Sequence, residues 1–125
     1  MSNLEDKVQA VIEWLTEKKA EAISTYDLSK LHSYTDYIIV CEGQADLHVR
    51  AIGNHLLDMA KEYHWTVMSK EGLDYGKWAL IDLGEIIVHV FMPDTRQYYN
   101  IDEFIRSYLK KAEEPEKIEA EIEHD

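Results

Sequence analysis

The sequence predicts a single α/β domain whose mixed β-sheet carries helices packed against it. Segments rich in β-branched and aromatic residues alternate along the chain with segments of helical periodicity. Near Gly84 two apolar strands follow one another across a tight turn, so at least one strand pair is antiparallel. A chain of 125 residues is long enough to bury a core and short enough to fold as one unit. We therefore place one domain at residues 1–112.

The first element is an amphipathic helix, which we expect over residues 4–22. Asn3 is suited to cap its N-terminus. Glu5 and Asp6 stand in the first turn, where acidic side chains interact favourably with the helix dipole. The residues of its apolar stripe are Leu4, Val8, Val11, Ile12, Leu15 and Ala22.

Two strands and a second helix follow. Residues 22–28 form a short segment typical of an edge strand, and Tyr37–Cys41 is a compact run of strand formers that ends at Gly43. The periodicity then predicts a helix over residues 45–64, with Asp46 as its cap. The apolar residues at helical spacing in this segment are Val49, Ile52, Leu56, Met59 and Tyr63.

The second half of the chain completes the sheet and ends in a helix. Residues 65–69 predict a third strand, and residues 70–77 predict a polar loop interrupted by glycine. After a hairpin, Pro93 is suited to the first position of a turn or short helix. A last helix is expected over residues 101–112, with one face made of Ile101, Phe104, Ile105, Tyr108 and Leu109.

The chain is strongly acidic, with 25 acidic against 13 basic residues and a formal charge of −12. Residues 110–125 contain seven acidic and three basic residues, so the rest of the chain still carries −8. Contact with phosphate backbones needs lysine and arginine, so nucleic acid is a poor partner and a basic protein is a suitable one. Solubility is the simpler explanation when charge is the only evidence. Residues 113–125 are predicted to be disordered or a frayed helical extension.

The rest of the composition excludes several classes of protein. A single cysteine, Cys41, allows neither an internal disulfide nor a cysteine-based metal site. No apolar run is long enough to span a bilayer, and the first ten residues lack the basic and apolar regions of a signal peptide. We therefore expect a cytoplasmic protein.

No arrangement of residues predicts a reaction centre. His48 and His55 share a helix face, but no H-x-x-x-H or E-x-x-H pair accompanies them, so we expect a partly buried His48 and a solvated His55. Cys41 ends an apolar strand, where it acts as a small hydrophobic residue rather than a nucleophile. The segment Val40–His48 has the strand–glycine–helix form that often binds phosphate, but its single glycine and its acidic residues argue against a nucleotide.

The hairpin at residues 77–91 has two different faces. A two-residue turn at Leu83–Gly84 places Asp82 opposite Glu85. One face is wholly apolar and must pack on the core helices; its residues are Ala79, Ile81, Leu83, Ile86, Val88 and Val90. The other face mixes apolar, aromatic and acidic side chains; its residues are Trp78, Leu80, Asp82, Glu85, Ile87, His89 and Phe91.

The mixed face has two interpretations, and these features do not decide between them. Trp78 is either buried beneath a helix in a second core layer, or exposed on a face that binds protein. Trp and Tyr dominate the binding energy of many interfaces, each contributing roughly 2 kcal/mol or more when a partner buries it. A three-residue turn would move Val88 and Val90 onto this face without changing the parity of the first strand. We expect His89 to be a structural neighbour of Trp78.

Three segments together resemble the ribosomal silencing factors, also called Iojap-like proteins. These segments are "TDYIIVCEGQADLHVRAI" (Thr35–Ile52), "GKWALIDLGEIIVHVF" (Gly76–Phe91) and "RQYYNIDEF" (Arg96–Phe104). The likeness extends from Val8 to Leu109, and the order and spacing of the segments fit the family.

The resemblance implies a nucleotidyltransferase-like sheet without catalytic residues, and therefore no enzyme activity, no metal and no cofactor. It implies that the partner is the large ribosomal subunit, bound through its ribosomal protein fourteen where the small subunit joins. Members sterically block that joining and so repress translation when nutrients are short, and many form homodimers. Transferred position by position, the docking surface includes Trp78, Asp82 and Tyr98, followed by Arg96, Tyr99, Lys70 and Glu71.

Two alternatives to a ribosome-docking repressor remain open. One is a relic nucleotidyltransferase, which would bind nucleotide and metal near Gly43–His48. Family members usually carry a small hydroxyl residue where this chain has Glu42, which makes nucleotide binding at that turn less expected. The other alternative is a dimeric adaptor whose partner is not the ribosome.

Overall fold

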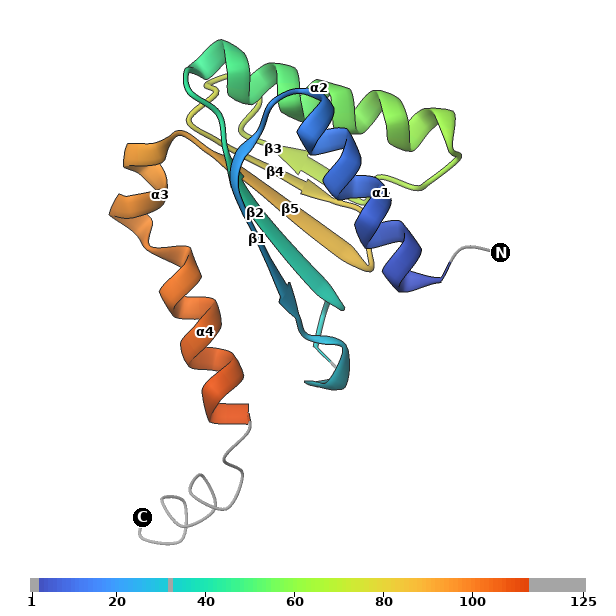
Figure 1. The fold of residues 1–125 in the computed structure, drawn as a ribbon, viewed down its shortest axis with the longest axis vertical. Helices are drawn as coiled ribbons and strands as arrows, with labels where there is room; N and C mark the ends of the chain where they lie inside the picture. The colour runs from blue at the N-terminus through green and yellow to red at the C-terminus, as the bar shows by residue number, and fades with distance from the viewer. Residues whose placement is uncertain (1–2, 32, 113–125) are drawn as a thin grey trace, which may run out of the picture.

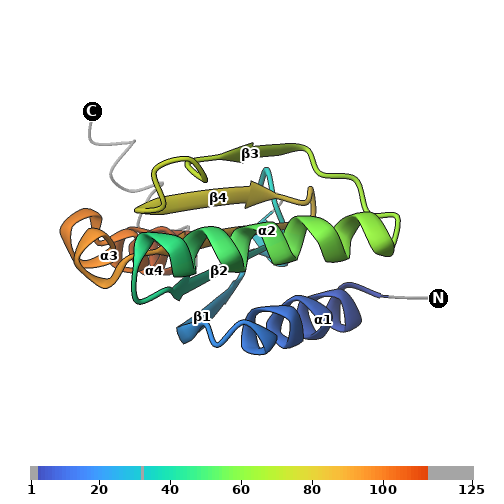
Figure 2. The same ribbon diagram turned by 90° about the horizontal axis from the view of Figure 1, so that it is seen from above.

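The computed structural model describes residues 3–31 and 33–112, which form one five-stranded sheet with helices on both faces (Figures 1 and 2). The elements in chain order are α1 (Leu4–Glu17), β1 (Glu21–Asp27), the 3₁₀ turn η1 (Ser29–Leu31), β2 (Tyr37–Glu42), α2 (Asp46–Glu62), β3 (Ser69–Glu71), β4 (Trp78–Asp82), β5 (Ile86–Phe91), α3 (Pro93–Tyr99) and α4 (Ile101–Ala112). The acidic tail predicted at residues 113–125 lies outside the described residues. None of the described helices is both long and apolar enough to cross a membrane.

The sheet is mixed, as predicted. Its strand order is β1-β2-β5-β4-β3. β2 and β5 are parallel, and the other neighbouring strands are antiparallel. β1 is an edge strand, which confirms the prediction for residues 22–28. Because β4 and β5 are antiparallel, the end of β5 lies beside the start of β4, and the chain enters α3 at that corner.

The main core lies between the sheet and the two helices α1 and α2, which share one face (Figure 2). The predicted apolar face of the hairpin points into this core, since Ala79, Ile81, Val88 and Val90 are fully buried. Burying each of the larger aliphatic side chains contributes roughly 1.5–3 kcal/mol to folding. This layer of the sheet follows directly from the alternation of the sequence.

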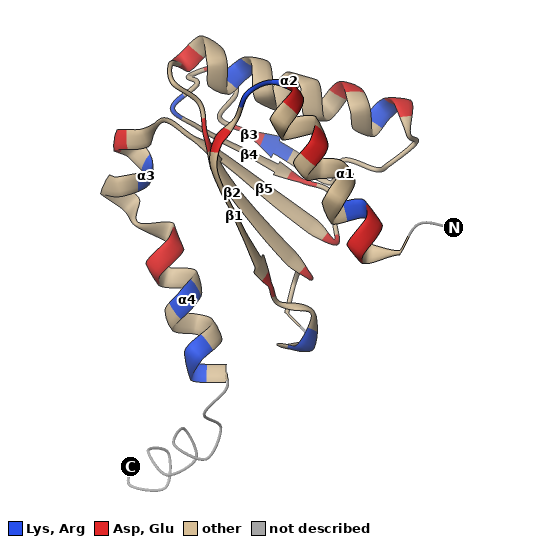
Figure 3. Cartoon of the chain, in the orientation of Figure 1, with Lys and Arg blue, Asp and Glu red and all other residues tan. Residues whose placement is uncertain are grey.

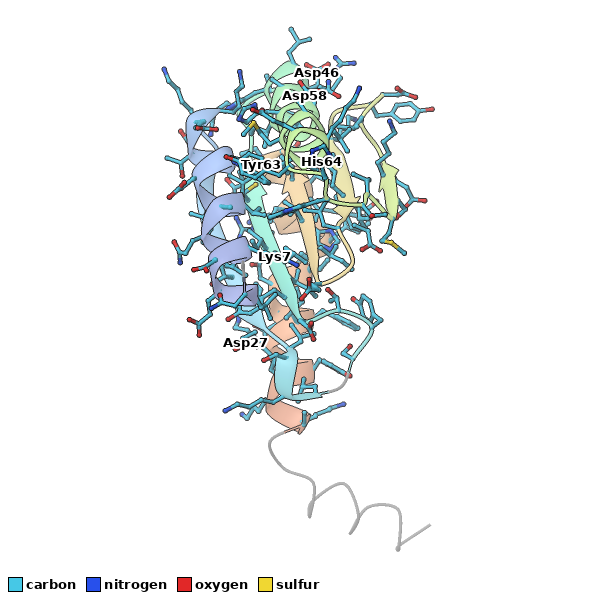
Figure 4. The ribbon with its side chains drawn as sticks, turned by 90° about the vertical axis from the view of Figure 1, so that its right-hand side faces the viewer. Lys7, Asp27, Asp46, Asp58, Tyr63 and His64 are labelled. Carbon is cyan, nitrogen blue, oxygen red and sulfur yellow. The ribbon has the colours of Figure 1, made fainter. Side chains whose placement is uncertain are left out.

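An aromatic cluster that the apolar pattern did not predict closes one end of the core. Trp14 of α1 is buried, and its ring centroid lies 4.9 Å from that of Trp65 and 5.4 Å from that of Tyr63. Figure 4 shows Tyr63 and Lys7 on this side of the molecule. Lys7 forms a 2.6 Å ion pair with Glu85, so the N-terminal helix also contacts the hairpin turn.

The opposite face of the sheet is covered by α4, but only in part. Ile105 is buried in a second cluster with Tyr26, Leu28, Ile38, Val40 and Phe91. Phe104 and Tyr108, predicted to share its face, remain 74% and 46% exposed. Trp78 packs at the edge of this cluster and is half-buried. Both interpretations of the mixed face therefore apply to different parts of it. One part is a second core layer under α4, and the other part, on β4, has accessible side chains.

The first helix is shorter than the residues 4–22 predicted. It ends at Glu17, the chain turns through Lys19 with a φ of 60°, and Ala22 belongs to β1. The intervening residues are strong helix formers, so local propensity favours continuation. The pairing of β1 with β2 overrides that propensity. The predicted cap is confirmed, because the Asn3 side chain accepts a first-turn backbone N–H at 2.8 Å.

Two predictions around α2 were wrong. Ala45 occupies the N-cap position, while Asp46 is already in the first turn and accepts the next backbone N–H. The third strand does not lie at residues 65–69, since β3 covers Ser69–Glu71. The reason is that Trp65 packs into the core against Trp14 and closes the end of α2 instead of pairing with β4.

The hairpin turn is displaced by one residue from its predicted position. Its central residues are Gly84 and Glu85, closed by a 2.8 Å backbone hydrogen bond between the residues that flank them. Gly84 supplies the positive φ of 89° at the first central position. Asp82 consequently pairs with Ile87 rather than with Glu85. The partner of Asp82 has moved by an even number of residues, so every residue of the hairpin keeps its predicted face. A three-residue turn would have moved the pairing by an odd number and is excluded.

Candidate protein-binding surface

The helix α3 places two tyrosines beside the start of β4. Pro93 occupies the first helical position, as predicted, where its missing N–H removes no hydrogen bond. Met92, the residue before it, donates its backbone N–H to the carbonyl of Lys77 at 2.9 Å. This bond ties the start of α3 to the residue that precedes Trp78.

Four aromatic side chains gather at this corner, and we call them the aromatic surface: Tyr75, Trp78, Tyr98 and Tyr99. The ring centroid of Tyr99 lies 5.0 Å from that of Trp78 and 5.0 Å from that of Tyr98. Tyr75 and Tyr98 are 82% and 81% exposed. The four rings surround a hollow of about 540 Å³ that is also lined by Gly72, Lys77, Asp94 and Thr95. Exposed rings clustered in this way are typical of surfaces that bind protein.

Trp78 is fixed from behind by a buried histidine. Its Nε1–H donates to Nδ1 of His89 at 3.0 Å, and its ring lies 4.8 Å from that of Phe91. Burial lowers the pKa of His89 to about 4. The imidazole is therefore neutral near pH 7, with Nδ1 free to accept the indole proton. The prediction that His89 is a structural neighbour of Trp78 is confirmed.

Tyr75 was not predicted, although the glycines around it gave a signal. Gly72 and Gly76 both have positive φ angles, 81° and 71°. A Cβ atom at Gly72 would stand 1.9 Å from the carbonyl oxygen of Trp78, and one at Gly76 would stand 2.5 Å from that of Asp46. Only glycine allows these close approaches, which hold the loop against α2 and β4 and direct Tyr75 outward.

Asp82 and Glu71 lie on the same face of the sheet as Trp78 but farther along it. Asp82 is four residues from Trp78 on β4, roughly 13 Å at the rise of a strand. Its carboxylate accepts the backbone N–H of Gly84 at 2.8 Å, so it also supports the hairpin turn. Glu71 pairs with Leu80 and is exposed. Both carboxylates therefore lie beyond the aromatic surface on the mixed face.

Lys70 lies apart from the other predicted site residues. It pairs with Ile81, whose side chain points into the core under α2, and directly opposed residues share a face. The hollow that it lines includes Arg50 and Asn54 of α2. Lys70 therefore accompanies α2 rather than the aromatic surface.

Arg96 belongs to α3 but points away from the aromatic surface. Its side chain is 12% exposed, and its guanidinium donates to both carboxylate oxygens of Asp102, at 2.8 and 2.9 Å. It also forms a 3.0 Å ion pair with Glu42. The hydrogen bonds from Arg96 lower the pKa of Asp102 to about 2. Of the predicted residues, the structure brings together Trp78, Tyr98 and Tyr99.

An apolar groove lies next to this surface, between α4 and the sheet. Its volume is about 330 Å³, and its floor includes Ile38, Ile87 and His89. Two exposed aromatic side chains stand at its rim, Phe104 on α4 and Tyr34 before β2, which is 77% exposed. Since His89 also holds Trp78, the groove and the aromatic surface share one supporting residue.

Three side chains that the sequence offered for chemistry, His48, His55 and Cys41, are bonded to other residues or buried. His48 accepts the backbone N–H of Gln44 at 2.9 Å and contacts the carbonyl of Lys18 at 2.7 Å. His55 was predicted to be solvated, but it is half-buried and bonds to Glu17. Cys41 is buried, which raises its pKa to about 12. Within residues 3–31 and 33–112, no group of three His, Cys, Asp or Glu side chains is placed to hold a metal ion.

The sequence and the fold are similar to those of known proteins. The family described as "ribosomal silencing factor during starvation" matches residues 1–125. A Bacillus subtilis protein named ribosomal silencing factor is 40% identical over 69% of this chain and 73% of its own length. A mouse protein named for mitochondrial assembly of the ribosomal large subunit is 24% identical over 81% of this chain and 46% of its own length.

Two solved structures share the fold. A Chromobacterium violaceum protein superimposes with a TM-score of 0.79 at 32% identity, covering 82% of this chain and 86% of that one. A Bacillus halodurans protein gives a TM-score of 0.74 at 33% identity, covering 80% and 93%. The sequence relatives from Bacillus subtilis and Halalkalibacterium halodurans are both named as ribosomal silencing factors. This chain belongs to the ribosomal silencing factor family.

Proposed function

We propose that this chain binds the large ribosomal subunit through its aromatic surface and thereby keeps the small subunit from joining. The family is named for silencing ribosomes, and the mouse relative is named for assembly of the large subunit. The observation that carries the proposal is the cluster of the exposed Tyr98 and Tyr99 with the half-buried Trp78, which is anchored through His89. Rigid aromatic side chains lose little entropy when a partner covers them, so they make effective anchors.

The partner on the subunit is its ribosomal protein fourteen, and charge supports a basic protein in this role. The chain carries a formal charge of −12, and acidic residues mark α1, α2 and the ends of the strands (Figure 3). Asp94 stands at the hollow of the aromatic surface, and Asp82 and Glu71 follow along the same face. Attraction between an acidic and a basic protein raises the rate of association and fixes orientation.

Silencing by this route needs a bound domain in the right place and no chemical step. A domain seated where the small subunit joins excludes that subunit by its volume. The relic enzyme would instead need nucleotide at Gly43–His48, where His48 bonds to backbone and a Cβ at Gly43 would stand 2.9 Å from the Val49 nitrogen. Calorimetry with nucleoside triphosphate and magnesium should therefore give no heat of binding, and a measurable heat would favour the enzyme.

Sedimentation of a lysate through a sucrose gradient tests the proposal, and the chain offers a matched pair of variants. Tyr99 and Tyr63 are both 56% exposed, and each lies beside one tryptophan, Trp78 or Trp14. The wild-type protein and Tyr63→Ala should travel with the large-subunit peak, whereas Tyr99→Ala should remain near the top. A wild-type protein absent from that peak would favour the adaptor whose partner is not the ribosome.

Two further variants test the extent of the surface. Trp78→Ala removes the central ring, and Asp82→Lys reverses a charge farther along the mixed face. Both should weaken the pull-down of purified large subunits. If both variants recover as many subunits as the wild type, the aromatic surface is not the docking surface.

Self-association is a second proposal, and the apolar groove is the surface that supports it. Phe104 is 74% exposed and lies beside the apolar groove on the same face. An exposed apolar side chain and a groove that could receive the same side chain of a second copy therefore lie next to each other. A two-fold dimer requires a self-complementary patch of this kind. Sedimentation equilibrium should show a dimer for the wild type and for Leu47→Glu, an exposed control on α2, and a monomer for Phe104→Glu. A dimer that survives Phe104→Glu would place the interface elsewhere.

A further inference from the structure

The helix that carries Tyr98 and Tyr99 is poorly supported by apolar packing. α3 has seven residues, and none of them is buried. An isolated helix of this length is not stable in water, so its position depends on contacts with the rest of the fold. Two such contacts are the Met92–Lys77 backbone hydrogen bond and the Tyr99–Trp78 ring contact. Neither fixes the rotation of the helix about its own axis.

The third contact is Arg96, whose side chain bonds to four residues on three other elements. Its guanidinium binds the Asp102 carboxylate with two hydrogen bonds and Glu42 at the end of β2 with one. It also donates to the carbonyl of Ala22 at 2.7 Å and to Ser24 Oγ at 3.2 Å, both on β1. A planar guanidinium with bidentate geometry allows little rotation, so these bonds define the orientation of α3 on the sheet.

The same pair of residues spans the bend between α3 and α4. Asn100 makes that bend with a φ of 52°, and its backbone N–H donates to the carbonyl of Arg96 at 2.8 Å. Asp102 lies just beyond it in α4, is 7% exposed, and accepts a further 2.5 Å hydrogen bond from the hydroxyl of Tyr26. The Arg96–Asp102 pair therefore locks the angle between the two helices and fastens both to β1.

Charge reinforces this arrangement. Glu42 and Asp102 both form ion pairs with Arg96. Without the positive charge of Arg96, these two carboxylates would lie near each other and would repel. Arg106 is close by, donating to the Tyr26 hydroxyl at 3.2 Å, but its side chain is 55% exposed. Because exposed charges are screened by water, Arg106 is a weak substitute for Arg96.

We propose that Arg96 is a positioning residue for docking, which acts through Asp102 to orient Tyr98 and Tyr99 on the aromatic surface and does not itself touch the partner. This inference rests on the proposed function of that surface. It differs from the role that the family resemblance implies for Arg96, which is direct contact with the ribosome. The two roles lead to different results in the protein free in solution.

The first measurement is hydrogen exchange of the α3 amides in the free protein. Arg96→Met removes the guanidinium but keeps an unbranched side chain, and Arg106→Met removes an equal charge from an exposed position. A positioning role predicts that exchange of the amides of residues 96–99 speeds up by about tenfold or more in Arg96→Met, because bonds to a buried charged group are lost. Arg106→Met should leave that exchange unchanged. Unaltered exchange in Arg96→Met would overturn the proposal.

Arg96→Lys separates charge from geometry and serves if Arg96→Met fails to fold. Lysine keeps the positive charge but cannot form the bidentate pair with Asp102. A positioning role predicts faster α3 exchange and weaker binding to large subunits in Arg96→Lys. Full binding with unaltered exchange in Arg96→Lys would show that charge alone is required, which contradicts the proposal.

A double-mutant cycle with Tyr26→Phe completes the test, since that change removes only the hydroxyl that bonds to Asp102. If Arg96 acts through Asp102, the effects of Arg96→Lys and Tyr26→Phe on large-subunit affinity should be less than additive. Strict additivity would argue for a direct contact by Arg96. Failure of the proposed function would give a different result. Wild-type protein would not bind large subunits, or Tyr98→Ala would bind them as tightly as the wild type, whatever the rate of exchange in α3.

Discussion

Trp78 Nε1 and His89 Nδ1 are joined by a 3.0 Å hydrogen bond across the β4–β5 pair, with the indole as donor. The bond links the central ring of the aromatic surface to a side chain that is 6% exposed. An indole N–H has a single direction of donation, so this bond sets which edge of Trp78 faces the sheet and which face is available to a partner. The aromatic surface is therefore built on a buried neutral histidine.

This bond predicts a pH dependence of stability. The pKa of His89 is lowered from 6.5 to about 4 by burial, so between these values the unfolded chain binds a proton that the folded chain does not. The free energy of unfolding should therefore fall by about 3 kcal/mol as the pH falls from 6.5 to 4. Urea titrations at several pH values measure the slope. His89→Gln, which keeps an acceptor for Trp78, should flatten it; an unchanged slope in this variant would assign the effect to other groups.

The Arg96–Asp102 pair predicts a large loss of stability when one partner is removed. Asp102→Asn leaves the guanidinium without its carboxylate in a site where Asp102 is 7% exposed, which should cost about 3 kcal/mol. Glu103→Gln removes an exposed carboxylate 3.3 Å from Arg106 and should cost about 0.5 kcal/mol or less. Chemical denaturation of the two variants compares these values. Equal losses would mean that the buried pair contributes no more than the surface pair.

The same pair has its own pH window. The pKa of Asp102 is lowered from 3.8 to about 2, so its contribution is complete above pH 4 and is lost as the pH falls through 2. This window lies below that of His89, and the two effects should appear as separate steps in a plot of unfolding free energy against pH. Asp102→Asn should remove only the lower step. Loss of the upper step in that variant would contradict the assignment.

Gly72 and Gly84 test how the loop that carries Tyr75 is held. Both have positive φ angles, 81° and 89°, but a Cβ at Gly72 would stand 1.9 Å from a backbone oxygen, whereas one at Gly84 would meet nothing closer than 3.8 Å. Gly84→Ala should cost only conformational strain, about 1–2 kcal/mol. Gly72→Ala should cost clearly more and should displace Tyr75. Thermal unfolding of both variants gives the comparison, and equal costs would mean that the Gly72 loop can move aside.

The two faces of the sheet could be predicted from the sequence because they depend on parity alone. Ala79, Ile81, Val88 and Val90 occupy alternate positions on their strands, so they share the buried face in either register of a two-residue turn. The register could not be predicted, because Gly84 can supply its positive φ at either central position of a two-residue turn. The choice depends on a bond from Asp82 to the turn and on the Thr35 hydroxyl, which donates to the carbonyl of Gly84 at 3.1 Å.

The predicted members of the candidate site differ in how far local sequence determines their position. Trp78 and Tyr98 were identified from residue type and family resemblance, and the structure brings them together. An arginine such as Arg96 is also a common residue at binding surfaces, so its residue type did not reveal that it points inward. That direction depends on its bonds to Glu42, which is distant in the sequence, and to Asp102, which follows the bend between α3 and α4. Tyr75 lay in a segment predicted as a loop. Its place depends on backbone contacts that only the folded chain reveals.

We propose that binding through the aromatic surface blocks the joining of ribosomal subunits. Light scattering of purified small and large subunits, mixed with and without the protein, measures that joining directly. The wild-type protein and Tyr63→Ala should lower the fraction of joined subunits, and Tyr98→Ala, which removes a ring that is 81% exposed, should leave that fraction unchanged. Joining that is unaffected by the wild type, or lowered equally by Tyr98→Ala, would contradict the account.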